Sequence, residues 1–195
     1  MPTANAANNP RGYEKLSAAA LSFSYDFRGK VVLDLGSSTG GFTKYALEAG
    51  AARVIALEKG TNQMMAPLRF DPRVDLREKT DLFTVTREDL GPVDTILADI
   101  SFCSLKKVLS YAREHYLTPG HPTDFLVMLK PQFEARPTDL NKGVVKNETI
   151  RRRLIKEFES WLKTHGFLVV QKRDNTLAGR TGNLERFYLL KSCQK

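Results

Sequence analysis

The chain has 195 residues, a net charge of +8 and a hydrophobic fraction of 42%, values that suit one globular domain and argue against a disordered chain. Its two cysteines provide neither a disulfide framework nor a metal-binding spacing, and no apolar run approaches the roughly 20 residues that cross a bilayer. Residues 1–10 are polar and lack the features of a secretion signal. We therefore expect a flexible N-terminal arm over residues 1–10, a single domain over residues 11–195, no metal site and a cytoplasmic location.

The domain is expected to begin with a helix and a buried strand. Apolar residues recur at helical spacing between residues 16 and 23. The apolar run that starts at Val31 then predicts a buried parallel strand, which Asp34 closes. A glycine-rich turn follows, and a second helix should end at Gly50.

This strand, turn and helix form the first half of a nucleotide-binding crossover. The glycines allow the backbone to approach a ligand, but they do not follow the G-x-G-x-x-G spacing of dinucleotide sites. An acidic residue before the first glycine favours a ligand with a cationic amino-acid tail, such as S-adenosylmethionine. Other nucleotides and a purely structural turn remain alternatives. The residues predicted to contact the ligand here are Asp34, Gly36, Ser37, Ser38, Thr39, Gly40, Gly41 and Phe42.

Two further acids follow the next predicted strands. Glu58 ends a strand over residues 53–57, about 20 positions past the turn, where a carboxylate meets ribose hydroxyls. A short helix is expected over residues 61–70 and a short strand over 74–76. Asp81 comes after that strand, and it could either accept from an adenine amine or cap a helix.

The second half of the chain continues the alternation of strands and helices. Asn147 should cap a helix that ends at Gly166, and Trp161 on its apolar stripe is expected to be a core residue. Residues 135–147 and 174–182 are predicted loops. The fold class is therefore α/β, with a mostly parallel sheet, helices on both faces and a final antiparallel pair. The strands predicted in this half cover residues 93–98, 125–129, 167–170 and 184–190, and a further helix covers residues 105–112.

The positive charge is concentrated in the C-terminal third. Residues 142–195 contain thirteen lysines and arginines against five acids, which accounts for the whole net charge. This excess favours a polyanionic partner, most simply nucleic acid, over a merely solvated surface. The residues predicted to bind RNA are Arg11, Lys142, Lys146, Arg151, Arg152 and Arg180.

Four polar residues fall where the predicted sheet opens toward a ligand: Lys15, Asp99, Lys130 and Glu185. Lys130 follows five apolar residues, and a lysine in that position needs an explanation because it is rarely buried unpaired. Any one of the four could be an ordinary surface ion pair. As a set beside a ligand-binding turn, they are candidates for catalysis.

The chain resembles the FtsJ-like RNA ribose methyltransferases, and more closely the catalytic domain of the TlyA (haemolysin A-like) family. The resemblance implies a class I methyltransferase (Rossmann-like) sheet of seven strands, the donor S-adenosylmethionine, and a Lys-Asp-Lys-Glu tetrad at Lys15, Asp99, Lys130 and Glu185. TlyA-like enzymes methylate cytidine 2′-hydroxyls in ribosomal RNA, so RNA or a ribosomal subunit is the expected partner. They carry an S4 RNA-binding domain before this domain, which leaves the RNA target of this chain open. The matching segments are 11–16, 34–43, 99–105, 130–134, 143–145 and 182–185.

A lysine acts as a base near neutral pH only when burial or a second ammonium disfavours its charged form, and Lys130 is the expected base. Base methylation is the nearest alternative, but Asp99-Ile-Ser-Phe102 is not an amine-methylating motif, and Cys103 is expected to be an apolar filler, not a nucleophile. A catalytically silent RNA-binding module and a membrane-lytic activity are further alternatives. The oligomeric state is left open.

Overall fold

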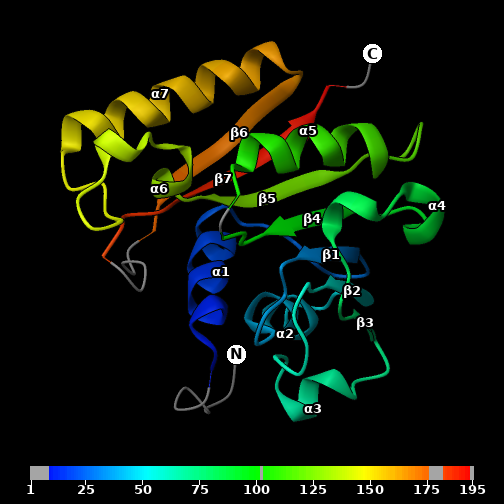
Figure 1. Cartoon of the computed structure of the whole chain (residues 1–195). Coiled ribbons are helices and arrows are strands. Elements are labelled where there is room, and N and C mark those ends of the chain that lie inside the picture. The colour runs from blue at the N-terminus through cyan, green and yellow to red at the C-terminus, as the bar shows by residue number, and fades with distance from the viewer. Residues whose placement is uncertain (1–8, 102, 176–181, 194–195) are drawn as a thin grey trace.

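The structure is a computed structural model that describes residues 9–101, 103–175 and 182–193. Its strands form one seven-stranded sheet in the order β3-β2-β1-β4-β5-β7-β6 (Figure 1). Neighbours among the first five strands are parallel, whereas β7 runs antiparallel to both β5 and β6. This matches the predicted mostly parallel sheet. The strands are β1 (Val31–Leu35), β2 (Arg53–Leu57), β3 (Val74–Arg77), β4 (Thr95–Ala98), β5 (Asp124–Leu129), β6 (Phe167–Asp174) and β7 (Arg186–Ser192).

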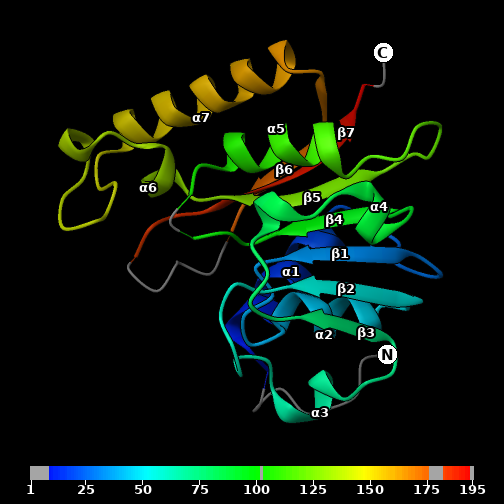
Figure 2. The ribbon, with the colours of Figure 1, turned by 45° about the vertical axis from the view of Figure 1, so that its right-hand side comes forward.

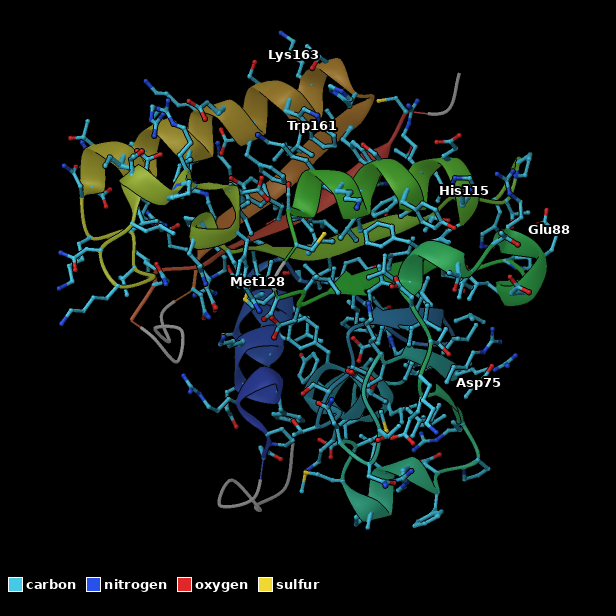
Figure 3. All side chains as sticks on the ribbon, viewed as in Figure 1. Asp75, Glu88, His115, Met128, Trp161 and Lys163 are labelled. Carbon is cyan, nitrogen blue, oxygen red and sulfur yellow. The ribbon has the colours of Figure 1, made fainter. Side chains whose placement is uncertain are left out.

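Helices cover both faces of the sheet (Figures 1 and 2). One apolar cluster joins α1 and α2 to one face, and a second joins α5 and α7 to the other. Trp161 on α7 packs against the second cluster, as predicted for a core residue (Figure 3). The helices are α1 (Arg11–Ser22), α2 (Gly41–Glu48), α3 (Ala66–Arg69), α4 (Arg87–Leu90), α5 (Leu105–His115), α6 (Pro131–Glu134) and α7 (Glu148–Thr164), with 3-10 turns η2 (Leu82–Thr84) and η3 (Pro137–Asp139).

Several predicted boundaries need correction. The helix expected over residues 61–70 is confined to the four residues of α3, and the loop expected over residues 135–147 contains η3. Strand β6 runs on to Asp174, because its second half pairs with β7 as far as Arg186. Of the loop expected over residues 174–182, residues 176–181 lie outside the described part of the chain, as do residues 1–8 of the expected arm.

The topology determines where the site forms. The parallel strands all end at the same edge of the sheet, so the residues that follow β4 and β5 lie together there (Figure 2). Strand β7 runs the opposite way, and Arg186 at its start pairs with Leu129 at the end of β5. The start of β7 therefore lies at this same edge, where Glu185 joins Asp99 and Lys130.

Candidate active site

Two adjoining cavities open at the carboxyl edge of the parallel strands. The larger has a volume of about 910 Å³ and is lined by the four candidate catalytic residues together with the glycine-rich turn. The smaller has a volume of about 640 Å³ and is lined by Glu58 and Asp81 among others. Both are lined by Gly36, Ser38, Asp99 and Ser101, so these residues form the boundary between them.

The candidate catalytic residues form two ion pairs on the wall of the larger cavity. Lys15 Nζ donates to Glu185 Oε2 over 2.6 Å, and these side chains are only 9% and 4% exposed. Lys130 Nζ lies 2.6 Å from Asp99 Oδ1, although its hydrogen bond goes to Ser101 Oγ at 2.9 Å. The four residues come from α1, the end of β4, the end of β5 and the start of β7, and folding brings them to one cavity as the sequence predicted.

Asp34 is the most unusual carboxylate of the site. Its Oδ2 accepts from Thr43 Oγ1 at 2.6 Å, while its Oδ1 is buried without a hydrogen-bond partner. Burial, the largest cause, raises the pKa of Asp34 to about 7 against the effect of the Thr43 bond, and the charge of Asp99 adds to the rise. A cationic group bound in the cavity would satisfy Oδ1 and favour the charged carboxylate. The ammonium of an amino-acid tail has that chemistry.

The glycines of the turn leave no room for a side chain. Gly36 has φ +74° and lines both cavities, and a Cβ at this position would lie 2.9 Å from Ile100 Cδ1. A Cβ at Gly40 or Gly41 would lie 2.4 Å from Leu68 Cδ2 and 2.7 Å from Tyr13 N respectively. Gly40 lines neither cavity, so the structure does not support its predicted ligand contact. The other predicted contacts of this turn that line the larger cavity are Asp34, Ser37, Ser38, Thr39, Gly41 and Phe42.

The smaller cavity contains the two acids predicted to recognise a nucleoside. Glu58 accepts from the backbone N–H groups of Ser38, at 2.9 Å, and Gly60, at 2.6 Å, so it also shapes the turn. Asp81 accepts from Phe83 N at 3.0 Å and pairs with Lys59 at 2.9 Å. These contacts lower the pKa of Asp81, the backbone bond most. Asp81 therefore caps η2, the alternative that the sequence left open, while it also lines the cavity.

The predicted RNA-binding residues separate into three groups. Arg11 lines the larger cavity, and Lys142, Lys146 and Arg152 are exposed. Arg180 lies outside the described residues. The prediction for Arg151 is wrong: its side chain is only 7% exposed, pairs with Asp174 at 2.6 Å and donates to the carbonyl of Leu184 at 3.3 Å. Arg151 is therefore a buried structural residue, and its guanidinium is not available to bind phosphate.

Sequence reasoning missed residues that shape the site. Ser101 contacts Lys130. Its position two residues after Asp99 is the sequence feature that could have identified it as a site residue. Glu134 accepts from Ser104 Oγ at 2.8 Å and from Leu105 N at 2.7 Å, which ties the segment after β5 to the start of α5. Glu134 is the last residue of segment 130–134, one of the segments that carry the family resemblance.

The described part of the chain was also compared with the requirements of a metal site and of a membrane span. Within the described residues, no three His, Cys, Asp or Glu side chains are placed to hold a metal ion. None of the described helices is long and apolar enough to cross a membrane. Cys103 is half-buried against the core, and burial raises the pKa of its thiol, so its placement fits the predicted filler.

Comparisons with known proteins agree with this site. The chain is 35% identical over 184 residues to the 16S/23S rRNA (cytidine-2′-O)-methyltransferase TlyA of Mycobacterium tuberculosis, which covers 93% of the chain and 68% of that protein. It is also 35% identical to YqxC of Bacillus subtilis, a candidate rRNA methyltransferase, over 90% of the chain and 62% of YqxC. The chain thus spans roughly two thirds of the length of these curated relatives.

A solved structure and a family comparison complete the assignment. A protein of Streptococcus thermophilus, described as a candidate hemolysin, superimposes with a TM-score of 0.90 at 28% identity, covering 100% of this chain and 70% of that one. Residues 9–192 match the FtsJ-like methyltransferases. Because this match includes both cavities and nearly the whole sheet, the chain belongs to the FtsJ-like methyltransferase family.

Proposed function

We propose that this chain transfers a methyl group from S-adenosylmethionine to a ribose 2′-hydroxyl of ribosomal RNA. The observation that carries the proposal is the convergence of two lysine–carboxylate pairs on the cavity that also contains the unpartnered oxygen of Asp34. A site that must bind a cationic donor and deprotonate a hydroxyl needs both features. The M. tuberculosis relative named above is a cytidine-2′-O-methyltransferase, which supports this choice.

The residues present fit S-adenosylmethionine. Asp34 Oδ1 would accept from the donor ammonium, and Gly36, which lines both cavities, would let the backbone approach the donor closely. Glu58 and Asp81 line the smaller cavity, where their carboxylates would accept from ribose hydroxyls and an exocyclic amine. When bound, the donor supplies an electrophilic methyl group on its sulfonium. The protein must then align a nucleophile with that methyl.

Lys130 would prepare the nucleophile. In its neutral amine form it would take the proton of the ribose hydroxyl and become an ammonium, as the oxygen bonds to the methyl carbon, the methyl–sulfur bond breaks and the donor leaves as a neutral thioether. Asp99 lies 2.6 Å from Lys130 Nζ and would stabilise that ammonium, while Ser101 orients it. The Lys15–Glu185 pair would hold the hydroxyl in place from the other side of the site.

The test incubates the protein with isotopically labelled donor and ribosomal subunits or total RNA, followed by mass spectrometry of the nucleosides. Label on a ribose oxygen is expected. Label on a base would support a base-methylating enzyme, and RNA binding without transfer would support a silent RNA-binding module.

Lys130→Met is expected to abolish transfer and leave donor affinity unchanged. Lys163→Met, an exposed lysine near the far end of α7, is the matched control and should retain activity (Figure 3). If Lys130→Met also loses donor affinity, Lys130 belongs to the donor site and not to the hydroxyl. Because ribosomal RNA is the proposed substrate, we propose that the enzyme acts in the cytoplasm.

A further inference from the structure

A tight hairpin projects from the loop before α7, on the side of the sheet where the cavities open (Figures 1 and 2). Asn141 and Val144 exchange both backbone hydrogen bonds, at 2.9 and 3.0 Å. Between them Lys142 and Gly143 have φ values of +48° and +79°, the pattern of a type I′ turn. Lysine rarely adopts this left-handed conformation. Its presence here indicates that the side chain at the tip of the hairpin has a specific role.

The base of this hairpin is bonded to the segment that carries Glu185. Asn183, whose surface is only 1% exposed, accepts from Val145 N at 3.0 Å and donates to the carbonyl of Gly143 at 3.1 Å. Both partners are backbone groups, so the amide fixes the hairpin as a neighbouring strand would. Glu185, two residues further on, pairs with Lys15 in the larger cavity. One buried side chain thus connects the hairpin to a candidate catalytic pair.

The lysines of the hairpin differ in their ion pairing from the arginines of the neighbouring helix α7. Arg152 pairs with Glu148, and Arg153 pairs with Asp139. Lys142 at the tip and Lys146 beyond Val145 are exposed, and within the described residues no carboxylate forms an ion pair with either. Exposed cations without a local counterion are those that a phosphate can bind without first breaking an ion pair.

We propose that residues 141–146 form a rigid finger that binds the phosphate backbone of the RNA, and that Asn183 is a positioning residue that sets the finger relative to Glu185. This inference rests on the proposed function. A phosphate bound at Lys142 would place the strand at a constant distance from the Lys15–Glu185 pair. Binding of the RNA backbone carries no sequence information. Through the finger, however, it would align one ribose with the site.

The first experiment measures the affinity for a ribosomal RNA fragment at increasing salt concentrations. Lys142→Ala and Lys146→Ala are each expected to lower the slope of log affinity against log salt by about 0.7 to 0.9, the value for one lost phosphate contact. Lys163→Ala is the control. It lies near the other end of α7, whose 17 residues span roughly 25 Å, and should leave the slope unchanged (Figure 3).

The second experiment separates positioning from folding. Asn183→Ala is expected to lower kcat about tenfold without changing donor affinity, and to lower the salt slope as much as Lys142→Ala does. In the Asn183→Ala background, Lys142→Ala should then have little further effect, because a mobile finger no longer holds the lysine on its phosphate. Asn147→Ala is the matched control. This variant removes an amide that lies next to the finger in the sequence but only caps α7. It should therefore retain kcat and the salt slope.

The outcomes also distinguish this inference from the proposed function. Wild-type protein that places no label in RNA overturns the proposed function, whatever the salt slopes. Wild-type protein that methylates RNA while Lys142→Ala and Lys146→Ala behave like Lys163→Ala overturns the finger, as does failure of the wild type to bind the fragment. Both lysines are exposed, so this result does not depend on how well Asn183→Ala folds.

Discussion

Lys15 Nζ lies 2.6 Å from Glu185 Oε2, although 170 positions separate the two residues along the chain. Lys15 is on the first helix, and Glu185 immediately precedes the last strand. Both side chains are nearly inaccessible to solvent, so each charge depends on the other for its stabilisation. The pair therefore links the two ends of the domain as well as forming part of the site.

Variants of this pair should separate stability from chemistry. Lys15→Met is expected to lower the free energy of unfolding by about 3 kcal/mol or more, because it leaves the Glu185 charge buried and unpaired. Adding Glu185→Leu should restore much of that loss while methyl transfer stays absent. Urea denaturation of both variants checks this. A loss below about 1 kcal/mol in Lys15→Met would contradict the prediction, since surface pairs contribute no more than that.

Donor binding should depend on the ionisation of Asp34. Its pKa is raised to about 7, so in the free protein the carboxyl group gains a proton as the pH falls through neutrality. A protonated carboxyl cannot pair with an ammonium. Affinity for S-adenosylmethionine is therefore expected to weaken by up to about tenfold per pH unit below pH 7, measured by calorimetry. In Asp34→Asn, affinity should be weak and should not follow this pH dependence.

The same shift has a consequence for folding. The folded-state pKa of Asp34 lies above the ordinary aspartate value of 3.8, so between about pH 4 and pH 7 the native state binds more protons than the unfolded state. Stability should then fall as the pH rises through this window, by up to about 4 kcal/mol for this group. Asp34→Asn removes the titrating group. Its unfolding free energy, compared with the wild type across the window, should lack that decline, and parallel curves would refute the assignment.

Gly36 is expected to tolerate no side chain. Gly36→Ala combines a left-handed φ, which costs about 1–3 kcal/mol, with a Cβ only 2.9 Å from Ile100 Cδ1 at the boundary of the two cavities. Donor affinity should fall along with stability. Gly120→Ala is the matched control because Gly120 has φ +79° with open space around its Cβ. It should lose stability alone, and equal donor affinities in the two variants would count against the role of Gly36.

Glu134 is expected to hold Lys130 in register with Asp99. Its two accepted hydrogen bonds tie the segment after β5 to the start of α5, and it lines neither cavity. Glu134→Gln can accept only one of them, so kcat should fall about tenfold while donor affinity stays constant. Glu159→Gln is the control, because Glu159 also accepts two bonds, from Lys172 and Tyr188, and lines neither cavity. Equal kcat values would show that Glu134 only stabilises the fold.

Adjacent arginines on α7 should behave in opposite ways. Arg151→Ala removes a buried guanidinium and frees the carbonyl of Leu184, while Asp174 keeps its ion pair with Arg186 at 2.9 Å, so a loss of about 1 to 2 kcal/mol is expected. Arg152→Ala removes an exposed charge and should change stability by no more than about 0.5 kcal/mol. Thermal unfolding with an RNA-binding assay checks both. Equal stabilities would show that Arg151 is not a structural residue.

The sequence predicted most of the architecture because local patterns suffice for it. Most strands contain an apolar run, and each predicted strand lies within a few residues of an observed one. The position of β7 between β5 and β6 is a property of the sheet as a whole, and a short return between the last two strands could not reveal it. The short helices α4 and α6 were also missed, since four residues leave too little periodicity to detect.

The error at Arg151 shows how a charge can mislead. Arg151 lies four residues before Ile155 and seven before Phe158, so its spacing placed it on the apolar face of α7. Its charge instead led to the prediction that it binds RNA. In the structure its guanidinium is buried because Asp174 and the carbonyl of Leu184 compensate it. Neither partner is near it in the chain.

What the sequence by itself determined was the alternation of strands and helices, the glycine-rich turn and the residue types available for chemistry. Those features depend on neighbours a few positions apart, which hydrophobic periodicity and backbone conformation govern. Only the tertiary structure decided which charges meet: Lys15 with Glu185, Lys130 with Asp99, and Asn183 with the finger. The energy of such contacts depends on burial and on distances of a few ångströms between remote segments. This burial and these distances are established only when the sheet has formed.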